Sequence, residues 1–199
     1  MTHLNKLFFI FICMFLWLAL PIYGQATREH ILLDNHWKFC LGHATDPSKD
    51  LYYRVYNDFS KTLSKGINFS SIDYDDSSWQ TVDLPHDWAI TLPFSEKGDW
   101  SHGYKALGNA FPEHSIGWYR KTFDLSKAEA GKRIELQFDG IFRDSRCWVN
   151  GIYVGHHLSG YTGIKYDITD LVHFGKPNVI TIRVDATQNE GWFYEGAGI

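Results

Sequence analysis

Cysteine is scarce in this 199-residue chain, which excludes the disulfide-rich class of small secreted proteins. Of its three cysteines, Cys13 lies in an apolar N-terminal segment, so Cys40 and Cys147 are the two that remain beyond it. Two cysteines can form one bridge but no disulfide framework. We expect two buried free thiols rather than a bridge, because cysteine packs readily as a small hydrophobic residue.

Excess positive charge is also missing. The chain carries 19 lysines and arginines against 23 aspartates and glutamates. Without the N-terminal segment that contains Lys6, the balance is 18 against 23, a net charge of −5. A nucleic-acid-binding domain usually presents a basic footprint, so this balance argues against nucleic acid as a partner.

The apolar run near the N-terminus is too short to span a membrane. It extends from Leu7 to Leu20, about 14 residues against the roughly 20 that a spanning helix needs. Lys6 precedes the run, and the small residues Gly24 and Ala26 follow it. This pattern predicts a secretory signal peptide over residues 1–26, with a mature chain of residues 27–199 that is secreted or periplasmic and makes no membrane contact after cleavage.

Aromatic residues, by contrast, make up 17% of the chain. In a mildly acidic exported protein such a content indicates a β-rich core, a sugar-binding face, or both. Apolar and polar residues alternate along several short segments, as they do in half-buried strands. The predicted strands lie within residues 37–41, 117–125, 132–140, 146–157, 160–172 and 178–186.

Short strands with frequent turns and little helical periodicity predict an all-β fold, an antiparallel jelly-roll or galactose-binding-like β-sandwich. The dipeptide Asn150-Gly151 predicts a tight hairpin turn, because a type I′ turn needs positive φ at both positions. The expected inward positions are Tyr119, Phe123, Leu125, Ile180, Ile182 and Val184. The expected outward positions are Arg120, Asp124, Thr181, Arg183 and Asp185, where a neighbouring strand or a partner domain can pair with Arg120 and Asp124.

Three further segments carry weaker signals. Residues 46–65 have apolar residues at helix-like spacing, which predicts a short helix or a structured excursion. Residues 95–112 have the composition of a long surface loop. His86-Asp87 could serve general acid–base chemistry, but no serine or cysteine nucleophile motif accompanies the pair, and we interpret it as structural. His156-His157 does not predict a metal site, because adjacent strand residues point to opposite faces.

Four motifs, in order, resemble the N-terminal sugar-binding domain of family 2 glycoside hydrolases, and most closely that of secreted bacterial β-galactosidases. The resemblance extends from Asp34 to Ile199. The motifs are "DLPHDWAI", "GWYRKTFDL", "LQFDGIFRDSRCWVNGIYVGHHLSGYTGIKYDITD" and "WFYEGAGI". It implies that a jelly-roll domain is followed by an immunoglobulin-like domain and a TIM barrel, which carries two catalytic glutamates and hydrolyses with retention. It therefore implies no catalytic residue, metal or cofactor in this chain, which should be inactive alone.

The resemblance also implies rim contacts to a sugar pocket in another domain. His114 occupies the position of an asparagine that reaches the galactose subsite in the best-known bacterial β-galactosidases. Glu190 matches an aspartate near the galactose, and Trp192 lies in the same loop. The implied partners are a β-galactoside substrate and the C-terminal domains of the same polypeptide.

Two other interpretations stay open. One is a free-standing carbohydrate-binding module, and the other is the same domain of a β-glucuronidase or β-mannosidase. The final segment "GAGI" has no polar tail, so we expect a truncated domain whose last strand is unfinished and leaves an unpaired edge. Such a fragment is expected to be marginally stable and to self-associate.

Overall fold

The computed structural model describes residues 28–51, 69–188, 191 and 193–199. The chain divides into two units, Met1–Leu32 and Leu33–Ile199. The described residues of the first unit, 28–32, have no regular secondary structure. In the described part of the chain no helix combines the length and the apolar character that crossing a membrane requires.

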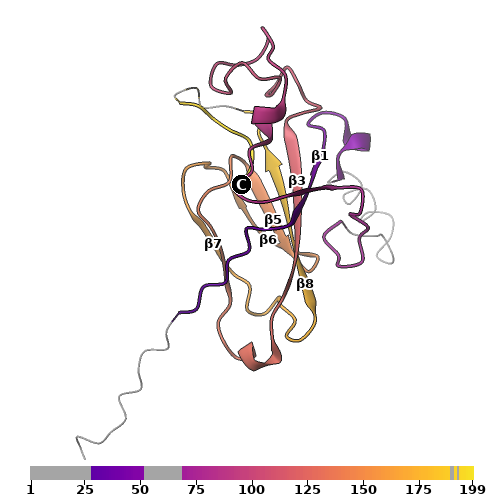
Figure 1. Cartoon of the computed structure of the whole chain (residues 1–199), viewed down its shortest axis with the longest axis vertical. Coiled ribbons are helices and arrows are strands. Elements are labelled where there is room, and N and C mark those ends of the chain that lie inside the picture. The colour runs from indigo at the N-terminus through magenta and orange to yellow at the C-terminus, as the bar shows by residue number, and fades with distance from the viewer. Residues whose placement is uncertain (1–27, 52–68, 189–190, 192) are drawn as a thin grey trace, which may run out of the picture. The chain divides into compact units, whose positions relative to one another are not determined.

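Antiparallel strands build the second unit (Figure 1). They are β1 (Trp37–Leu41), β2 (Gln80–Val82), β3 (Ile116–Asp124), β4 (Glu135–Phe138), β5 (Ser145–Val149), β6 (Ile152–His157), β7 (Ile164–Asp167) and β8 (Pro177–Asp185). Within the described residues, one sheet has six strands in the order β2-β1-β3-β8-β5-β6, and the other consists of β4 and β7. The described residues also form three short 3-10 helices, η1 (Pro47–Lys49), η2 (Trp88–Thr91) and η3 (Lys127–Glu129). The predicted all-β antiparallel sandwich is confirmed.

The main core contains the side chains that alternate inward from both sheets. The six residues that the sequence predicts to face inward all belong to this core. They are Tyr119 and Phe123 of β3, Leu125 directly after β3, and Ile180, Ile182 and Val184 of β8. Leu136 and Phe138 of β4 and Ile164 of β7 supply the facing layer. The hairpin between β5 and β6 is confirmed as well, since Asn150 has φ 50° and Gly151 has φ 87°.

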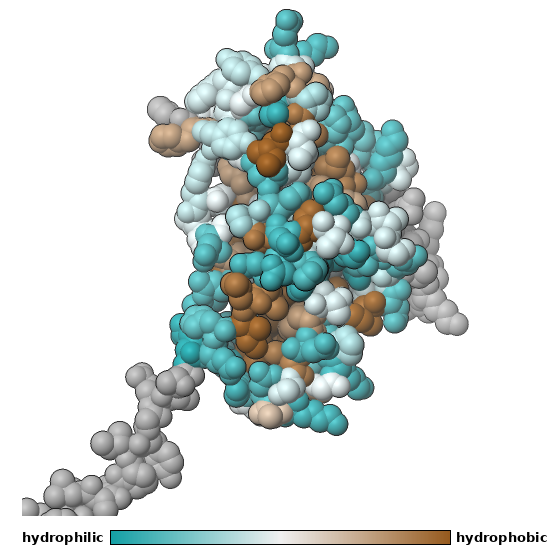
Figure 2. All heavy atoms as spheres, viewed as in Figure 1, coloured by the Kyte–Doolittle hydropathy of each residue, from teal (hydrophilic) through white to brown (hydrophobic). Residues whose placement is uncertain are grey.

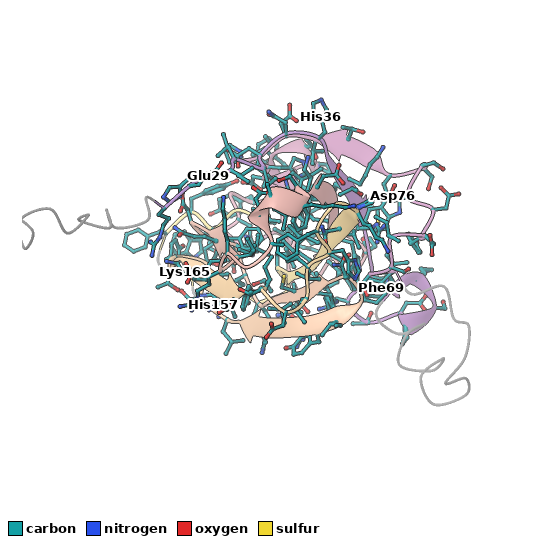
Figure 3. The ribbon with its side chains drawn as sticks, turned by 90° about the horizontal axis from the view of Figure 1, so that it is seen from below. Glu29, His36, Phe69, Asp76, His157 and Lys165 are labelled. Carbon is teal, nitrogen blue, oxygen red and sulfur yellow. The ribbon has the colours of Figure 1, made fainter. Side chains whose placement is uncertain are left out.

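The outer face of the large sheet is also buried, which corrects the sequence-based prediction. Thr181 and Arg183 were expected to face outward, but their exposed fractions are 0% and 6%, and Arg120 is 2% exposed. A second apolar cluster covers this face, with Phe69, Trp79, Ile116, Trp118 and Trp148 as its members. Figure 3 shows Phe69 and Asp76 on one side of the ribbon and Lys165, from β7, on the other.

Buried ion pairs attach the covering segment to the sheet. Arg120 Nε lies 2.8 Å from Asp76 Oδ2, and the same guanidinium donates to the carbonyl oxygens of Phe69 and Ser71. Arg183 Nη2 lies 3.0 Å from Asp50 Oδ2. The partners Asp50 and Asp76 lie outside the strands and far away in sequence, and strand alternation alone therefore assigned Arg183 to solvent.

Cys40 and Cys147, the cysteines among the described residues, are free. Cys40 of β1 packs against the outer cluster, whereas Cys147 of β5 belongs to the main core. They lie on opposite faces of the sheet, with β3 and β8 between their strands. Burial raises the pKa of both thiols to about 12. The prediction of free thiols is confirmed. The helix or excursion predicted over residues 46–65 is described only at η1 and up to Leu51, because residues 52–68 lie outside the described part.

Candidate functional site at the loop end of the sandwich

The two ends of the sandwich differ in the length of their connections. Where β3 begins and β8 ends, Ile116 faces Asp185, and the long segments 86–115 and 186–199 gather (Figure 1). Where β3 ends, Asp124 faces Pro177, and the connections are the Asn150-Gly151 turn and the turn around η3. We name these the loop end and the turn end.

Exposed apolar and aromatic side chains gather at the loop end. The described residues there that are more than half exposed are Ile90, Phe94, Trp100, Tyr104, Leu158, Tyr161, Phe193 and Tyr194. Figure 2 shows apolar surface interleaved with polar surface in this upper part of the molecule. Exposed apolar surface rimmed by polar residues commonly marks an interaction site.

His114, the first predicted site residue, lies at the loop end and is half-buried. Its Nδ1 is 2.9 Å from the carbonyl oxygen of Ala106, and its own carbonyl oxygen accepts from Trp88 Nε1 at 2.8 Å. A carbonyl oxygen only accepts, so Nδ1 must carry the proton in this hydrogen bond. In the neutral ring, Nε2 is then the acceptor available to a sugar hydroxyl.

Glu190 and Trp192, the other two predicted site residues, lie outside the described residues. Their described neighbours belong to the loop end. Gly191 donates its backbone N–H to Glu195 Oε1 at 3.1 Å, and Phe193 and Tyr194 are exposed. The structure therefore brings His114 and residues 186–188, 191 and 193–199 to the same end of the sandwich, and Glu190 and Trp192 are outside what it describes.

Asp87 connects η2 to the C-terminal segment. Its Oδ1 accepts from the backbone N–H groups of Ala89 and Ala197, each at 2.9 Å, and its Oδ2 accepts from the Tyr194 hydroxyl at 3.0 Å. A Cβ at position 196 would stand 2.5 Å from Oδ2, so the close approach requires Gly196. Burial, reinforced by the charge of Asp87, raises the pKa of Tyr194 to about 12, and the hydroxyl keeps its proton. These hydrogen bonds give this carboxylate a structural role.

His86 forms a neutral pair with a core tyrosine. Its Nδ1 is 2.8 Å from the hydroxyl oxygen of Tyr119. Burial lowers the pKa of His86, although the charge of Asp87 opposes this shift, and burial raises the pKa of Tyr119 well above its usual value. Both shifts favour uncharged side chains, which suits packing rather than proton transfer at neutral pH.

A buried contact that the sequence analysis missed joins the two long segments of the loop end. His102 and Glu195 are 0% and 1% exposed. His102 Nδ1 lies 2.7 Å from the carbonyl oxygen of Glu195, and the Glu195 N–H donates to the Ser101 carbonyl oxygen at 2.6 Å. Single polar residues in loops produce no periodicity, so no signal in the sequence could have paired these two positions.

The final segment is hydrogen-bonded on both sides, which makes the expected unpaired edge wrong. Gly198 exchanges two backbone hydrogen bonds with Phe142, at 2.9 and 3.0 Å. On its other side, Ile199 exchanges two with His86, and Ala197 accepts from Trp88 N–H at 2.9 Å. Phe142 and His86 are loop residues and Trp88 begins η2, and all three are far away in sequence, so strand patterning could not reveal these contacts.

Hydrogen bonds stabilise the charged form of three acids in the described part of the chain. Hydrogen bonds from Ser48, Ser77 and Thr169, respectively, lower the pKa values of Asp46, Asp75 and Asp167. A general acid for glycoside cleavage needs the opposite shift. In the described part of the chain, no group of three or more His, Cys, Asp or Glu side chains could hold a metal. His156 and His157 contact different partners, Asp144 and Thr162.

Comparisons with known proteins agree with this fold. Residues 31–195 match the family model described as "Glycosyl hydrolases family 2, sugar binding domain". The chain is 39% identical over 138 residues to the β-galactosidase BoGH2A of Bacteroides ovatus, a match that covers 69% of this chain and 16% of that protein. It is 37% identical over 144 residues to a putative β-glucuronidase of Formosa agariphila, covering 72% of this chain and 13% of the relative.

Solved structures show the same similarity. A glycosyl hydrolase family 2 member from Bacteroides cellulosilyticus has a TM-score of 0.65 and 31% identity, over 87% of this chain and 20% of that one. A β-glycosidase from Bacteroides vulgatus has a TM-score of 0.65 and 29% identity, over 86% of this chain and 19% of that one. The chain thus spans a fifth or less of the length of these relatives.

Proposed function

Since the chain belongs to glycosyl hydrolase family 2, of which it matches the sugar-binding domain, we propose that it serves a longer, exported glycoside hydrolase with β-galactosidase-like activity. In that protein the domain supports the catalytic barrel and adds contacts to the rim of its sugar site. The acid and the nucleophile come from the barrel, so this chain alone is inactive. Its partners are a β-galactoside and the C-terminal domains of the same polypeptide.

The observation that carries this proposal is the concentration of exposed aromatic side chains at the loop end. The long loops there are hydrogen-bonded to one another, since Asp87 accepts from the Ala197 N–H and His102 Nδ1 lies 2.7 Å from the Glu195 carbonyl oxygen. Rigid loops with exposed aromatics suit a surface that another domain and a ligand both contact.

His114, Glu190 and Trp192 are the proposed rim residues. His114 is held through Nδ1, so its Nε2 can accept from a substrate hydroxyl. We expect one neutral hydrogen bond of this kind to contribute about 1 kcal/mol to substrate binding. The proposed location is secreted or periplasmic, with residues 1–26 removed as a signal peptide.

The genetic test is the reading frame beyond Ile199. The proposal requires it to continue for several hundred codons and to encode two glutamates at the ends of barrel strands. A stop codon soon after Ile199 would contradict it and would favour a free-standing carbohydrate-binding module.

The biochemical test uses the full-length enzyme with His114→Ala and a matched control, His173→Ala, an exposed histidine at the turn end. We expect the first variant to lower kcat/KM for an aryl β-galactoside about fivefold to tenfold, and the control to leave it unchanged. Equal kcat/KM values for the two variants would show that His114 does not contact the substrate. The 199-residue chain should show no hydrolysis above background.

A β-glucuronidase is the second candidate, and the 37% identity to a putative β-glucuronidase favours it. The same full-length enzyme assayed on aryl β-galactoside and aryl β-glucuronide distinguishes the two. We expect the higher kcat/KM on the galactoside, and the reverse ratio would select the second candidate.

A further inference from the structure

Glu195 is an acidic residue that lies in a loop and is nevertheless buried. Its exposed fraction is 1%, and it directly follows the exposed aromatic residues Phe193 and Tyr194 in the sequence. Glutamate is seldom fully buried, because a charged group taken out of water costs free energy unless hydrogen bonds compensate for it. The contacts of Glu195 therefore have to offset the cost of its burial.

The Glu195 side chain closes a loop in the C-terminal segment. Its Oε1 accepts a hydrogen bond from the backbone N–H of Gly191, four residues earlier, at 3.1 Å. Gly191 has φ 76°, in the left-handed region that favours glycine. Because Gly191 stands between Glu190 and Trp192 in the sequence, this hydrogen bond restrains the backbone between two of the proposed rim residues.

The backbone of Glu195 is held by the same segment that holds His114. The Glu195 N–H donates to the Ser101 carbonyl oxygen at 2.6 Å. The Glu195 carbonyl oxygen lies 2.7 Å from His102 Nδ1, which must carry the proton because a carbonyl oxygen only accepts. Further along this segment, the Ala106 carbonyl oxygen lies 2.9 Å from His114 Nδ1. One stretch of chain thus supports both Glu195 and the rim residue His114.

Tyr194, inside the closed loop, is anchored as well. Its hydroxyl donates to Asp87 Oδ2 at 3.0 Å, and a Cβ at position 103 would stand 3.4 Å from its ring, so the ring lies against Gly103. The Tyr194 side chain is still 55% exposed, and that of Phe193 is 71% exposed. An aromatic ring held in place before binding loses little conformational freedom when a partner contacts it. The loop that Glu195 closes therefore presents a preorganised surface.

From these contacts we propose that Glu195 is a positioning residue for the rim of the sugar site. It is buried and acts through the Gly191 N–H, by holding the loop in the conformation that contacts the substrate. This inference rests on the proposed function, because the rim meets a substrate only in the longer enzyme. It requires that the reach of the Glu195 side chain matters for substrate binding and that its charge does not.

Two substitutions in the full-length enzyme separate reach from charge. Glu195→Gln removes the charge but keeps an Oε1 that can accept from the Gly191 N–H. Glu195→Asp keeps the charge but is one methylene too short to reach it. With an aryl β-galactoside, we expect Glu195→Asp to raise KM about fivefold with kcat nearly unchanged, and Glu195→Gln to keep the natural values. The opposite order would show that the charge itself acts and would overturn the inference.

Asn178→Ala is the control for a general loss of stability. Asn178 is 0% exposed at the turn end, where its Oδ1 accepts from the His173 N–H at 2.6 Å and from Asn150 Nδ2 at 2.8 Å. We expect this variant to melt at a lower temperature but to keep the natural KM. A KM raised as much as in Glu195→Asp would show that KM follows stability, and would overturn the positioning role.

Hydrogen exchange of the Gly191 N–H, measured by NMR on the 199-residue chain, tests the contact without any activity. Exchange should be slow in the natural chain and in Glu195→Gln, and about fivefold faster or more in Glu195→Asp, because one hydrogen bond is lost. Equal exchange in all three proteins would overturn the inference. The expected exchange together with a full-length enzyme that cleaves no aryl β-glycoside would contradict the proposed function alone.

Discussion

The loop end and the turn end of the sandwich lie at opposite ends of the same strands, but they connect these strands in different ways. The turn end closes strands with few residues, and Asn150 and Gly151 reverse the chain between β5 and β6. The loop end has long segments between its strands, and the half-buried Asp87 and the buried His102 hydrogen-bond these segments to one another. The polar residues of the loop end thus hold long segments together, whereas the polar residues of the turn end form the tight turns between strands.

Two glycines provide the largest expected contrast between the ends. A Cβ at position 198 would overlap the His86 carbonyl oxygen, whereas a Cβ at position 131, in the turn after η3, would meet no atom within 4 Å. We expect Gly198→Ala to lower the free energy of unfolding by about 3 kcal/mol or more, because the backbone on both sides must move. Gly131→Ala, with its φ of 89°, should cost about 1–2 kcal/mol.

Urea unfolding of both variants measures the difference. Equal losses in the free energy of unfolding would show that the C-terminal segment can move to accommodate the added methyl group, and that the loop end is not rigid.

Asp87 gives the next largest effect. Removal of its carboxylate in Asp87→Ala leaves two backbone N–H groups and the Tyr194 hydroxyl without their acceptor. We expect a loss of about 2–3 kcal/mol in the free energy of unfolding. Asp167→Ala is the matched control, since Asp167 of β7 is an exposed acceptor towards the turn end and its removal should have a small effect. Thermal unfolding checks the order, and a control variant as unstable as Asp87→Ala would contradict the distinction.

A smaller, pH-dependent effect is expected from His86. Its folded-state pKa is lowered, chiefly by burial, so the unfolded chain binds this proton more readily than the folded one. Stability should therefore fall as the pH drops below the unfolded value of about 6.5. His86→Gln should remove this part of the pH dependence, as measured by melting temperature between pH 7 and pH 5. A variant with the same slope as the natural chain would assign the dependence to another group.

Much of the fold could be predicted from the sequence, because alternation and turn chemistry are local. The strand ending in Asp124, the inward Ile180 and Ile182, and the hairpin at Asn150 followed from residues a few positions apart. The family resemblance, drawn from four motifs, is confirmed by the family model. The burial of Arg183 could not be predicted, because its ion-pair partner Asp50 lies far away in the sequence.

The candidate site was predicted only in part. The position of His114 at the loop end follows from its place just before β3, but its hydrogen bond to Ala106 does not. His102 and Glu195 were missed because their contact depends on how two loops meet. Glu190 and Trp192 stay predictions. Loop geometry depends on contacts between distant residues, and these have no periodic trace in a single sequence.

The central claim is that the loop end, and not the turn end, faces the rest of a longer enzyme. Hydrogen exchange measured by mass spectrometry on the 199-residue chain and on the full-length enzyme tests it most directly. Exchange in the longer protein should slow over residues 86–115 and 193–199 and stay unchanged over residues 126–133 and around Asn150. Protection at the turn end, or equal exchange at both ends in the two proteins, would contradict the account.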